Sequence, residues 1–279
     1  MSCDIEVVLG YEKGKLDSIE SYYIMVAELK NTRHKLMTNF CMNSQQLKEA
    51  ILRNEVEYEY KHGKYLNLVI ADDGFSRLYY YVIEAKDYHF GGKSNTFVCD
   101  IFFMEEDKDI DKVIMALCHE GFSQYKSYHK VILKNPKIVN VEKNNDVEII
   151  QGIDKNTIEL MYQYFDKFSD YLPRKFELEK FVCSKKFLSL YDIKSHELLG
   201  GLIYTEKNHS VIEEFLFVKE KAQGRKLSNF LHFFWYEILA GSDVKFTAWI
   251  RDDNIPSIAL HSRYNYQYAK IVKITYLKK

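Results

Sequence analysis

The chain has 279 residues, of which 47% are hydrophobic and 28% charged, enough to bury one large core or two modest ones. Lysine and arginine number 39 against 40 acidic residues, so no net charge draws the protein to nucleic acid or to an anionic membrane. The five cysteines are scattered and never form a C-x-x-C pair, which argues against a disulfide framework and against a zinc site.

No export or membrane segment is evident in the sequence. The first ten residues carry no basic segment ahead of an apolar run, so we expect no secretory signal. The most apolar helical stretch, Leu227 to Leu239, is too short to span a bilayer and contains Glu237. These features predict a soluble protein of the reducing cytosol, with neither a membrane nor a nucleic acid as its partner.

The first half of the chain is typical of a mixed α/β domain. Residues 65–73 and 77–90 have the pattern of two strands joined by a turn at Gly74. Another strand follows over residues 96–104, and then a helix from about Asp109. We predict that this half forms one domain, residues 1–140.

A polar stretch around Pro136, residues 134–146, has no sustained helical pattern and is the best candidate for a joint between domains. Beyond it, residues 186–193 and 197–208 form a second hairpin pattern. A strand over residues 210–218 follows it, and then a helix from about Arg225. We predict a second domain over residues 147–279.

The two halves share this order of elements, which indicates an internal repeat with an offset of 114 residues. In that register Asp100 matches Glu214, Phe103 matches Phe217, and Ile110 stands where the second half has Gly224. The alternative is two unrelated α/β halves, because strands and amphipathic helices look alike by pattern alone. If the repeat holds, the function of Gly224 belongs to the second half only.

Gly224 precedes a helix whose apolar face we expect at Leu227, Phe230, Leu231, Phe234 and Ile238. The first N–H groups of a helix have no partner inside it and carry the positive end of its dipole. A glycine lets an anion approach them closely, and Arg225 and Lys226 add positive charge. The turn suits a phosphate or pyrophosphate, although an ordinary connecting turn is the alternative.

Residues 248–268 carry a second local signal. Asn254 is a good helix cap, and Pro256 lies in the first turn of a short apolar helix. This helix should stop near Asn265, because asparagine tolerates the left-handed conformation. The second half therefore runs strand, phosphate turn, helix, strand, capped short helix and final strand.

That order, with those residues, resembles the GCN5-related N-acetyltransferase family over residues 147–279. The family's acyl-CoA loop, Gln/Arg-x-x-Gly-x-Gly/Ala after a strand ending in valine, is matched by Val218 and by Gln223, Gly224, Arg225, Lys226, Leu227 and Ser228. Its later signature, Asn-x-x-Ala/Ser-x-x-Leu-Tyr-x-x-x-Gly-Phe, is matched by Asn254, Ser257, Leu260, His261, Asn265 and Tyr266. The chain departs from the family at Lys226, where glycine is preferred, at His261, where tyrosine is, and at Asn265-Tyr266, which replace Gly-Phe.

The resemblance implies an α/β fold with a mixed sheet, in two tandem acyl-CoA N-acyltransferase domains of which the first is degenerate and walls the substrate cleft. It implies acetyl-CoA as cofactor and direct acetyl transfer to a primary amine in a ternary complex. The cofactor-binding residues that it implies are Phe217, Val218, Gln223, Gly224, Arg225, Lys226, Leu227, Ser228, Asn254 and Ser257.

Such a transfer needs a base for the amine and an acid for the leaving thiolate. Glu213 and Glu214 are candidates for the base, and because they are adjacent in a strand only one can face the cleft. His261 and Tyr264 are candidates for the acid. Each of the four has a structural alternative, as an ion-pair partner or a packing residue, and we predict no metal site.

Two other functions fit the sequence less well. One is a non-catalytic binding or scaffold protein, in which Lys226 and the altered signature mark decay. The other is aminoacyl transfer of the peptidoglycan-bridge type, made by enzymes that also carry two such domains. The acceptor remains open among antibiotics, polyamines, amino sugars, amino acids and protein termini, and a homodimer remains an open alternative.

Overall fold

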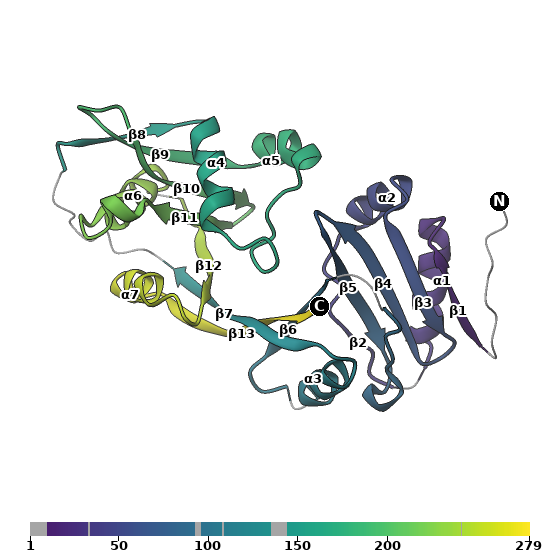
Figure 1. Ribbon diagram of the computed structural model, residues 1–279. Helices are drawn as coiled ribbons and strands as arrows, with labels where there is room; N and C mark the ends of the chain where they lie inside the picture. Colours follow the sequence, from purple (N-terminus) through teal and green to yellow (C-terminus); the bar gives the residue numbers. More distant parts are fainter. Residues whose placement is uncertain (1–9, 33, 93–95, 108, 135–143, 241) are drawn as a thin grey trace. The chain divides into compact units, whose positions relative to one another are not determined.

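The computed structural model describes residues 10–279 except 33, 93–95, 108, 135–143 and 241 (Figure 1). The chain divides into two compact units, Met1–Lys126 with Lys273–Lys279, and Ser127–Val272. The predicted joint at Pro136 lies outside the described residues. None of the described helices is long and apolar enough to cross a lipid bilayer.

The first unit is a mixed sheet with helices on both faces. Its sheet order is β1-β3-β4-β5-β6, followed by the end of β13, with β2 pairing β5. Residues of α1 and α2 pack with Tyr79 and Tyr81 of β5, whereas Leu117 of α3 packs with Leu78 and Tyr80 on the other face. Its elements are β1 (Tyr11–Lys15), α1 (Ile19–Lys30), β2 (Met37–Thr38), α2 (Ser44–Leu52), β3 (Val56–Lys61), β4 (Tyr65–Asp72), β5 (Phe75–Val82), the 3-10 turn η1 (Ala85–Asp87), β6 (Phe97–Met104), α3 (Ile110–His119) and the start of β7 (Ser123–Lys134).

The second unit is also a mixed sheet between two helical layers. Its sheet order is β8-β9-β10-β11-β12-β7. Ile203 of β10 packs in the core under α4, whereas Leu202 packs with α6 and α7 on the other face. Its elements are β8 (Val147–Gln151), α4 (Lys155–Tyr164), η2 (Lys175–Glu177), α5 (Leu178–Ser184), β9 (Lys186–Asp192), β10 (Leu198–Lys207), β11 (Ser210–Val218), η3 (Glu220–Ala222), α6 (Leu227–Ile238), β12 (Lys245–Arg251), α7 (Ile255–Arg263) and β13 (Gln267–Lys278).

The two units pair their strands in the same order, but not in the predicted register. In the first, antiparallel β3-β4-β5 is followed by a parallel pair that starts at Ser76 and Phe97 of β6. In the second, β9-β10-β11 is followed by a parallel pair that starts at Ser210 and Lys245 of β12. Thus β5 corresponds to β11, β6 to β12 and α3 to α7.

The offset of 114 residues is therefore wrong, because it matches β6 to β11 and α3 to α6. The error arises because hydrophobic periodicity distinguishes a strand from a helix but not one strand from the next. In the correct register, α6 has no helical counterpart in the first unit. The described part of the segment between β5 and β6 contains one short regular element, the 3-10 turn η1.

The last strand of the first half, β7, belongs mostly to the second unit, and the last strand of the second half, β13, ends in the first unit. Residues Tyr128–Lys134 of β7 pair antiparallel with β12 and belong to the second unit. The chain ends in the first unit, whose sheet takes residues from Lys273 of β13 onward. The closing strand of each unit thus comes from the other half of the sequence.

Candidate functional site

Strands β11 and β12 part midway along their length. They pair in parallel from Ser210 and Lys245 to Glu213 and Ala248, and no further. Strand β11 then continues to Val218, and β12 to Arg251. Beyond the last pair, the backbone edges that face each other lack a neighbouring strand and can accept an extended ligand.

A β-bulge lies at the same place. Ile203 of β10 stands opposite Phe215, and the next residue, Tyr204, stands opposite Glu213, so Glu214 is the extra residue of β11. A bulge of this kind bends its strand and redirects the side chains beyond it. The bend therefore lies where β11 leaves β12.

Glu213 and Glu214 face different sides of the sheet. The Glu213 carboxylate contacts His232 of α6 and His261 of α7. The Glu214 carboxylate instead accepts hydrogen bonds from Lys185 Nζ at 2.8 Å and Thr205 Oγ1 at 2.9 Å. Its side chain is 29% exposed, so a substrate on the side of α4 and α5 can reach it.

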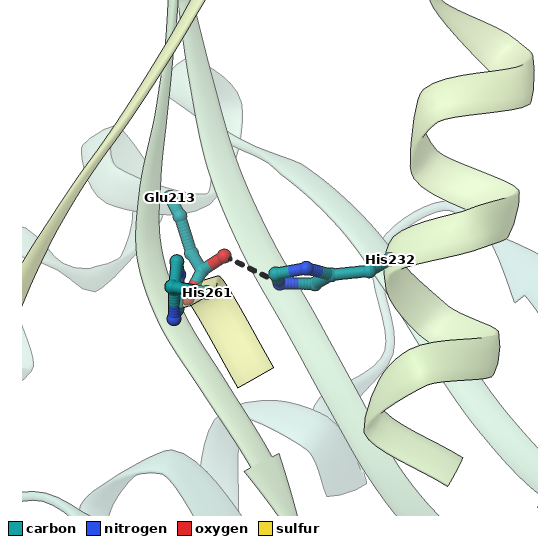
Figure 2. A group of neighbouring side chains, drawn as sticks. All are labelled: Glu213, His232 and His261. Carbon is teal, nitrogen blue, oxygen red and sulfur yellow. Dashed lines mark hydrogen bonds and ion pairs between the residues drawn. The ribbon is translucent and has the colours of Figure 1, made fainter. Parts of the chain in front are cut away.

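The Glu213 carboxylate lies between the rings of His232 and His261, and all three side chains are buried (Figure 2). The side chain of His232 has no exposed surface, and those of His261 and Glu213 expose 2% and 8%. His232 Nε2 donates a hydrogen bond of 2.8 Å to one carboxylate oxygen. His261 Nε2 lies 3.5 Å from the other oxygen.

Opposite charges dominate the electrostatics of this cluster. Burial disfavours the ionised form of Glu213, but the attraction of His261 and His232 outweighs it and holds the pKa of the carboxyl well below its usual range. Burial also opposes charge on His261, yet the adjacent Glu213 raises the pKa of that imidazole. For His232, burial prevails and lowers the pKa. The two imidazoles therefore keep this buried carboxylate ionised at neutral pH.

Hydrogen bonds fix the outer nitrogen of each ring. His261 Nδ1 donates to the Ser257 carbonyl at 2.8 Å, one turn earlier in α7. His232 Nδ1 lies 3.3 Å from the Tyr236 hydroxyl, which contacts the Tyr266 hydroxyl at 2.8 Å. Both Nε2 atoms consequently point toward Glu213.

The predicted phosphate turn is open. Gly224 has φ +80°, and a Cβ built there would meet no atom within 4 Å. Lys226 is left-handed as well, with φ +60°, and precedes α6 without capping it through its side chain. The helix begins at Leu227, two residues later than predicted, and the turn from Gln223 to Lys226 is exposed. The first N–H groups of α6 are therefore available to an anion.

The second predicted signal has the expected backbone. Asn254 Oδ1 accepts from the Ser257 N–H at 3.2 Å and caps α7. Asn265 has φ +64°, so the chain leaves the helix in the left-handed conformation. Tyr264 is buried, its hydroxyl donates to the Asn229 carbonyl at 3.1 Å, and burial raises its pKa to about 12.

Sequence reasoning missed His232 and misplaced part of the apolar face of α6. Ile238, predicted to be buried, is 37% exposed, whereas His232, Trp235 and Tyr236 lie in the core. The available signal was the spacing of Leu231, His232, Trp235 and Tyr236, which repeats after four residues. His232 obscured this apolar pattern, because a polar residue is not expected on a buried helix face.

In the first unit, the corresponding strands β5 and β6 also separate, and the segment of β2 and Asn39 contacts them there. Strands β5 and β6 pair only at Ser76 and Arg77, and β2 then pairs with the end of β5. The next residue, Asn39, is buried, and its Nδ2 donates to the carbonyls of Leu78 at 3.0 Å and Asp100 at 2.8 Å. Asn39 therefore bridges the two strands.

A pocket of about 800 Å³ lies in the first unit, between η1, α3 and the segment before β2. Its Lys35 and Lys112 already pair with Asp109, and Lys86 pairs with Glu84. With Glu120, the lining holds three carboxylates against three lysines, so the pocket presents no net charge that would select a ligand.

Comparison with known proteins shows the fold but not the family. No model of a protein family matches the sequence, and no curated protein matches it. Solved structures do match: a tandem GNAT protein from the clavulanic acid biosynthesis pathway, described as without AcCoA, has TM-score 0.60 at 11% identity and covers 96% of this chain and 98% of its own.

A GCN5-related N-acetyltransferase from Sphaerobacter thermophilus has TM-score 0.58 at 10% identity, covering 98% and 96% of the two chains. The chain has the GCN5-related N-acetyltransferase fold. A probable N-acyltransferase from Enterococcus faecalis V583 is also similar, with TM-score 0.53 at 11% identity, over 95% of this chain and 71% of its own. The mixed sheets and the tandem GNAT-like arrangement agree with the predicted fold class.

Proposed function

We propose that the protein is an acyl-CoA-dependent N-acyltransferase, whose second unit binds acetyl-CoA and transfers the acetyl group to a primary amine. One observation carries the proposal: β11 and β12 part after Glu213 and Ala248, and the open turn at Gly224 connects β11 to a helix without a side-chain cap. An extended cofactor with a pyrophosphate group needs both features in one place.

The pyrophosphate would bind the N–H groups of Leu227 and Ser228 at the start of α6. Gly224 leaves space for it, and the exposed Arg225 and Lys226 add positive charge. The pantetheine would then run between the facing edges of β11 and β12. This arrangement brings the thioester to the bulge, where backbone N–H groups of β11 from Phe215 to Val218 could stabilise the developing oxyanion.

Glu214 is the better candidate for the base. Both carboxylate oxygens of Glu213 face histidines in a closed core, whereas Glu214 is partly exposed beside Lys185 and Thr205. The amine nitrogen would attack the thioester carbon as Glu214 accepts the amine proton, directly or through water. The carbon–sulfur bond then breaks, and the thiolate takes a proton.

Tyr264 is the candidate for the acid that supplies this proton, and its hydroxyl would have to exchange its hydrogen bond to the Asn229 carbonyl for one to the thiolate. Its phenol keeps its proton at neutral pH, because burial raises its pKa to about 12. His261 is held instead between the Ser257 carbonyl and Glu213, so it is not free to reach a thiolate. Acceptor amines would approach from the side of α4 and α5, on which Glu214 lies.

Calorimetric titration with coenzyme A and acetyl-CoA tests cofactor binding, and release of free thiol in the presence of a panel of primary amines tests transfer. We expect saturable binding of both and amine-dependent thiol release. Absence of any binding would overturn the proposal. Binding without turnover on any amine would instead favour a non-catalytic protein.

A further inference from the structure

Three potential metal ligands converge in the core of the second unit. One carboxylate oxygen of Glu213 and one imidazole nitrogen each of His232 and His261 all lie within 4.8 Å of one another (Figure 2). They come from β11, α6 and α7, so residues distant in the sequence meet at the point where β11 leaves β12.

The surroundings orient both rings as metal ligands are oriented. A histidine that binds a metal through one nitrogen almost always hydrogen-bonds through the other. His261 does so through Nδ1 to the Ser257 carbonyl, and His232 through Nδ1 to the Tyr236 hydroxyl. The two Nε2 atoms are left to face the carboxylate.

His261 Nε2 is incompletely satisfied by the protein alone. It is buried, forms no hydrogen bond, and lies 3.5 Å from the nearest Glu213 oxygen. A charge-assisted hydrogen bond would be about 2.7–2.9 Å long. A cation between these atoms would satisfy the nitrogen and the oxygen together, in a core where an unpaired polar atom is unfavourable.

We propose that Glu213, His232 and His261 bind one Zn²⁺ ion, which ties β11, α6 and α7 together. Two imidazoles and a carboxylate form a donor set that zinc uses in proteins. Bonds of about 2.0–2.2 Å place two ligands of a tetrahedral ion about 3.3 Å apart. His232 Nε2 lies 2.8 Å from one Glu213 oxygen and His261 Nε2 lies 3.5 Å from the other, and one donor atom from each residue lies within 4.8 Å of the other two. The three side chains would have to draw together around the ion.

On zinc binding, the single ring proton of neutral His232 moves from Nε2 to Nδ1 by exchange with water, and Nδ1 then donates it to the Tyr236 hydroxyl. His261 likewise binds through a deprotonated Nε2. No fourth protein ligand is identified among the described residues, so water would complete the tetrahedron. The ion is enclosed with the core, so it would bind as the second unit folds and stabilise that unit.

Metal analysis by inductively coupled plasma mass spectrometry tests the site directly. The full chain is purified without a metal-affinity step, unfolded and stripped with a chelator, and then refolded with or without ZnSO₄ before its melting temperature is measured. We expect about one ion per chain and a higher melting temperature with zinc than without it. Absence of zinc both in the purified protein and after refolding with ZnSO₄, with no difference in melting temperature, would overturn the proposal.

Variants identify the ligands. His232→Gln and His261→Gln should each remove stoichiometric zinc, whereas His129→Gln, which changes a partly exposed histidine paired with Asp252, should retain it. Tyr236→Phe keeps all three ligands and should weaken zinc affinity about tenfold through the loss of an outer hydrogen bond. If the ligand variants fail to fold, the metal content of the wild type and of Tyr236→Phe still decides the question. None of these measurements depends on acetyl-CoA binding.

Discussion

Asn39 Oδ1 accepts a hydrogen bond of 2.7 Å from the backbone N–H of Tyr80. The same side chain donates from Nδ2 to the carbonyls of Leu78 and Asp100, so one residue links β5 to β6 within the first unit. In an acyl-CoA site, backbone groups at this position would be left for the pantetheine. In the first unit these groups bind Asn39 instead, and the described part of the segment after β5 contains no counterpart of α6.

We therefore expect one molecule of coenzyme A per chain. Asn39→Ala should destabilise the protein by about 1–3 kcal/mol, because three buried backbone groups lose their partner. It should leave the stoichiometry and affinity for coenzyme A unchanged. Denaturant unfolding and calorimetric titration measure the two effects, with Gln45→Ala on the exposed face of α2 as control. Two molecules bound per wild-type chain would contradict the asymmetry.

The turn before α6 should govern cofactor affinity. Gly224→Val and Ser228→Trp should each weaken coenzyme A binding at least about tenfold, or roughly 1.4 kcal/mol, because a side chain would fill the space that the pyrophosphate needs. Calorimetric titration is the measurement. Unchanged affinity in folded variants would exclude this turn as the site.

Gly74→Val provides the matched control for Gly224→Val. Gly74 has φ +77°, close to the +80° of Gly224, and a Cβ at either position would meet no atom within 4 Å. Both valines therefore strain the backbone to a similar degree, but the hairpin turn at Gly74 lies in the first unit. Only the change at Gly224 should affect binding of coenzyme A.

Unfolding measurements can verify which face of α6 is buried. Leu231 is fully buried, and Leu231→Ala should destabilise the protein by about 2–5 kcal/mol. Ile238 is 37% exposed, and Ile238→Ala should change stability by less than about 1 kcal/mol. Equal losses of stability in the two variants would mean that Ile238 is buried, as the sequence predicted.

Local signals in the sequence predicted local structure well. Asn254 caps α7 and Asn265 is left-handed, because the side chain of each acts on its own backbone. Hydrophobic periodicity predicted β4 to β6 with α3 in the first half and β9 to β13 with α6 and α7 in the second, but α1, α2, α4 and α5 were not predicted. The opposite orientations of Glu213 and Glu214 were also predicted, although the bulge at Glu214 was not.

Features that depend on distant partners could not be predicted. Asn39 reaches β5 and β6 from a separate segment, and nothing in its neighbours indicates that role. His232 meets Glu213 only after α6 has packed on the sheet. A repeat register likewise depends on which strands pair, and pairing is decided by the tertiary fold rather than by pattern.

A pH effect is expected in the first unit. His62 contacts Glu12 at 2.8 Å and Glu28 at 3.3 Å, and the hydrogen bond to Glu12 raises the pKa of the imidazole. The stability it contributes is fully present below its ordinary pKa of about 6.5 and is lost as pH rises through the raised value. Because His62 is 45% exposed, solvent screening keeps the effect below about 1 kcal/mol. Thermal unfolding of the wild type and of His62→Gln from pH 5 to pH 9 should show that the wild type's advantage in free energy of unfolding decreases as the pH rises.

The division of roles between the two glutamates gives the test of mechanism. Glu214→Gln should lower the rate of acetyl transfer at neutral pH by about 10²- to 10⁴-fold, because general-base catalysis is lost, while coenzyme A affinity stays the same. Steady-state rates measured from pH 7 to pH 10 should show part of the loss recovered at high pH, where the amine loses its proton unaided. Glu206→Gln serves as control, since it makes the same change at an exposed carboxylate on the neighbouring strand β10. A wild-type rate for Glu214→Gln would exclude this carboxylate as the base.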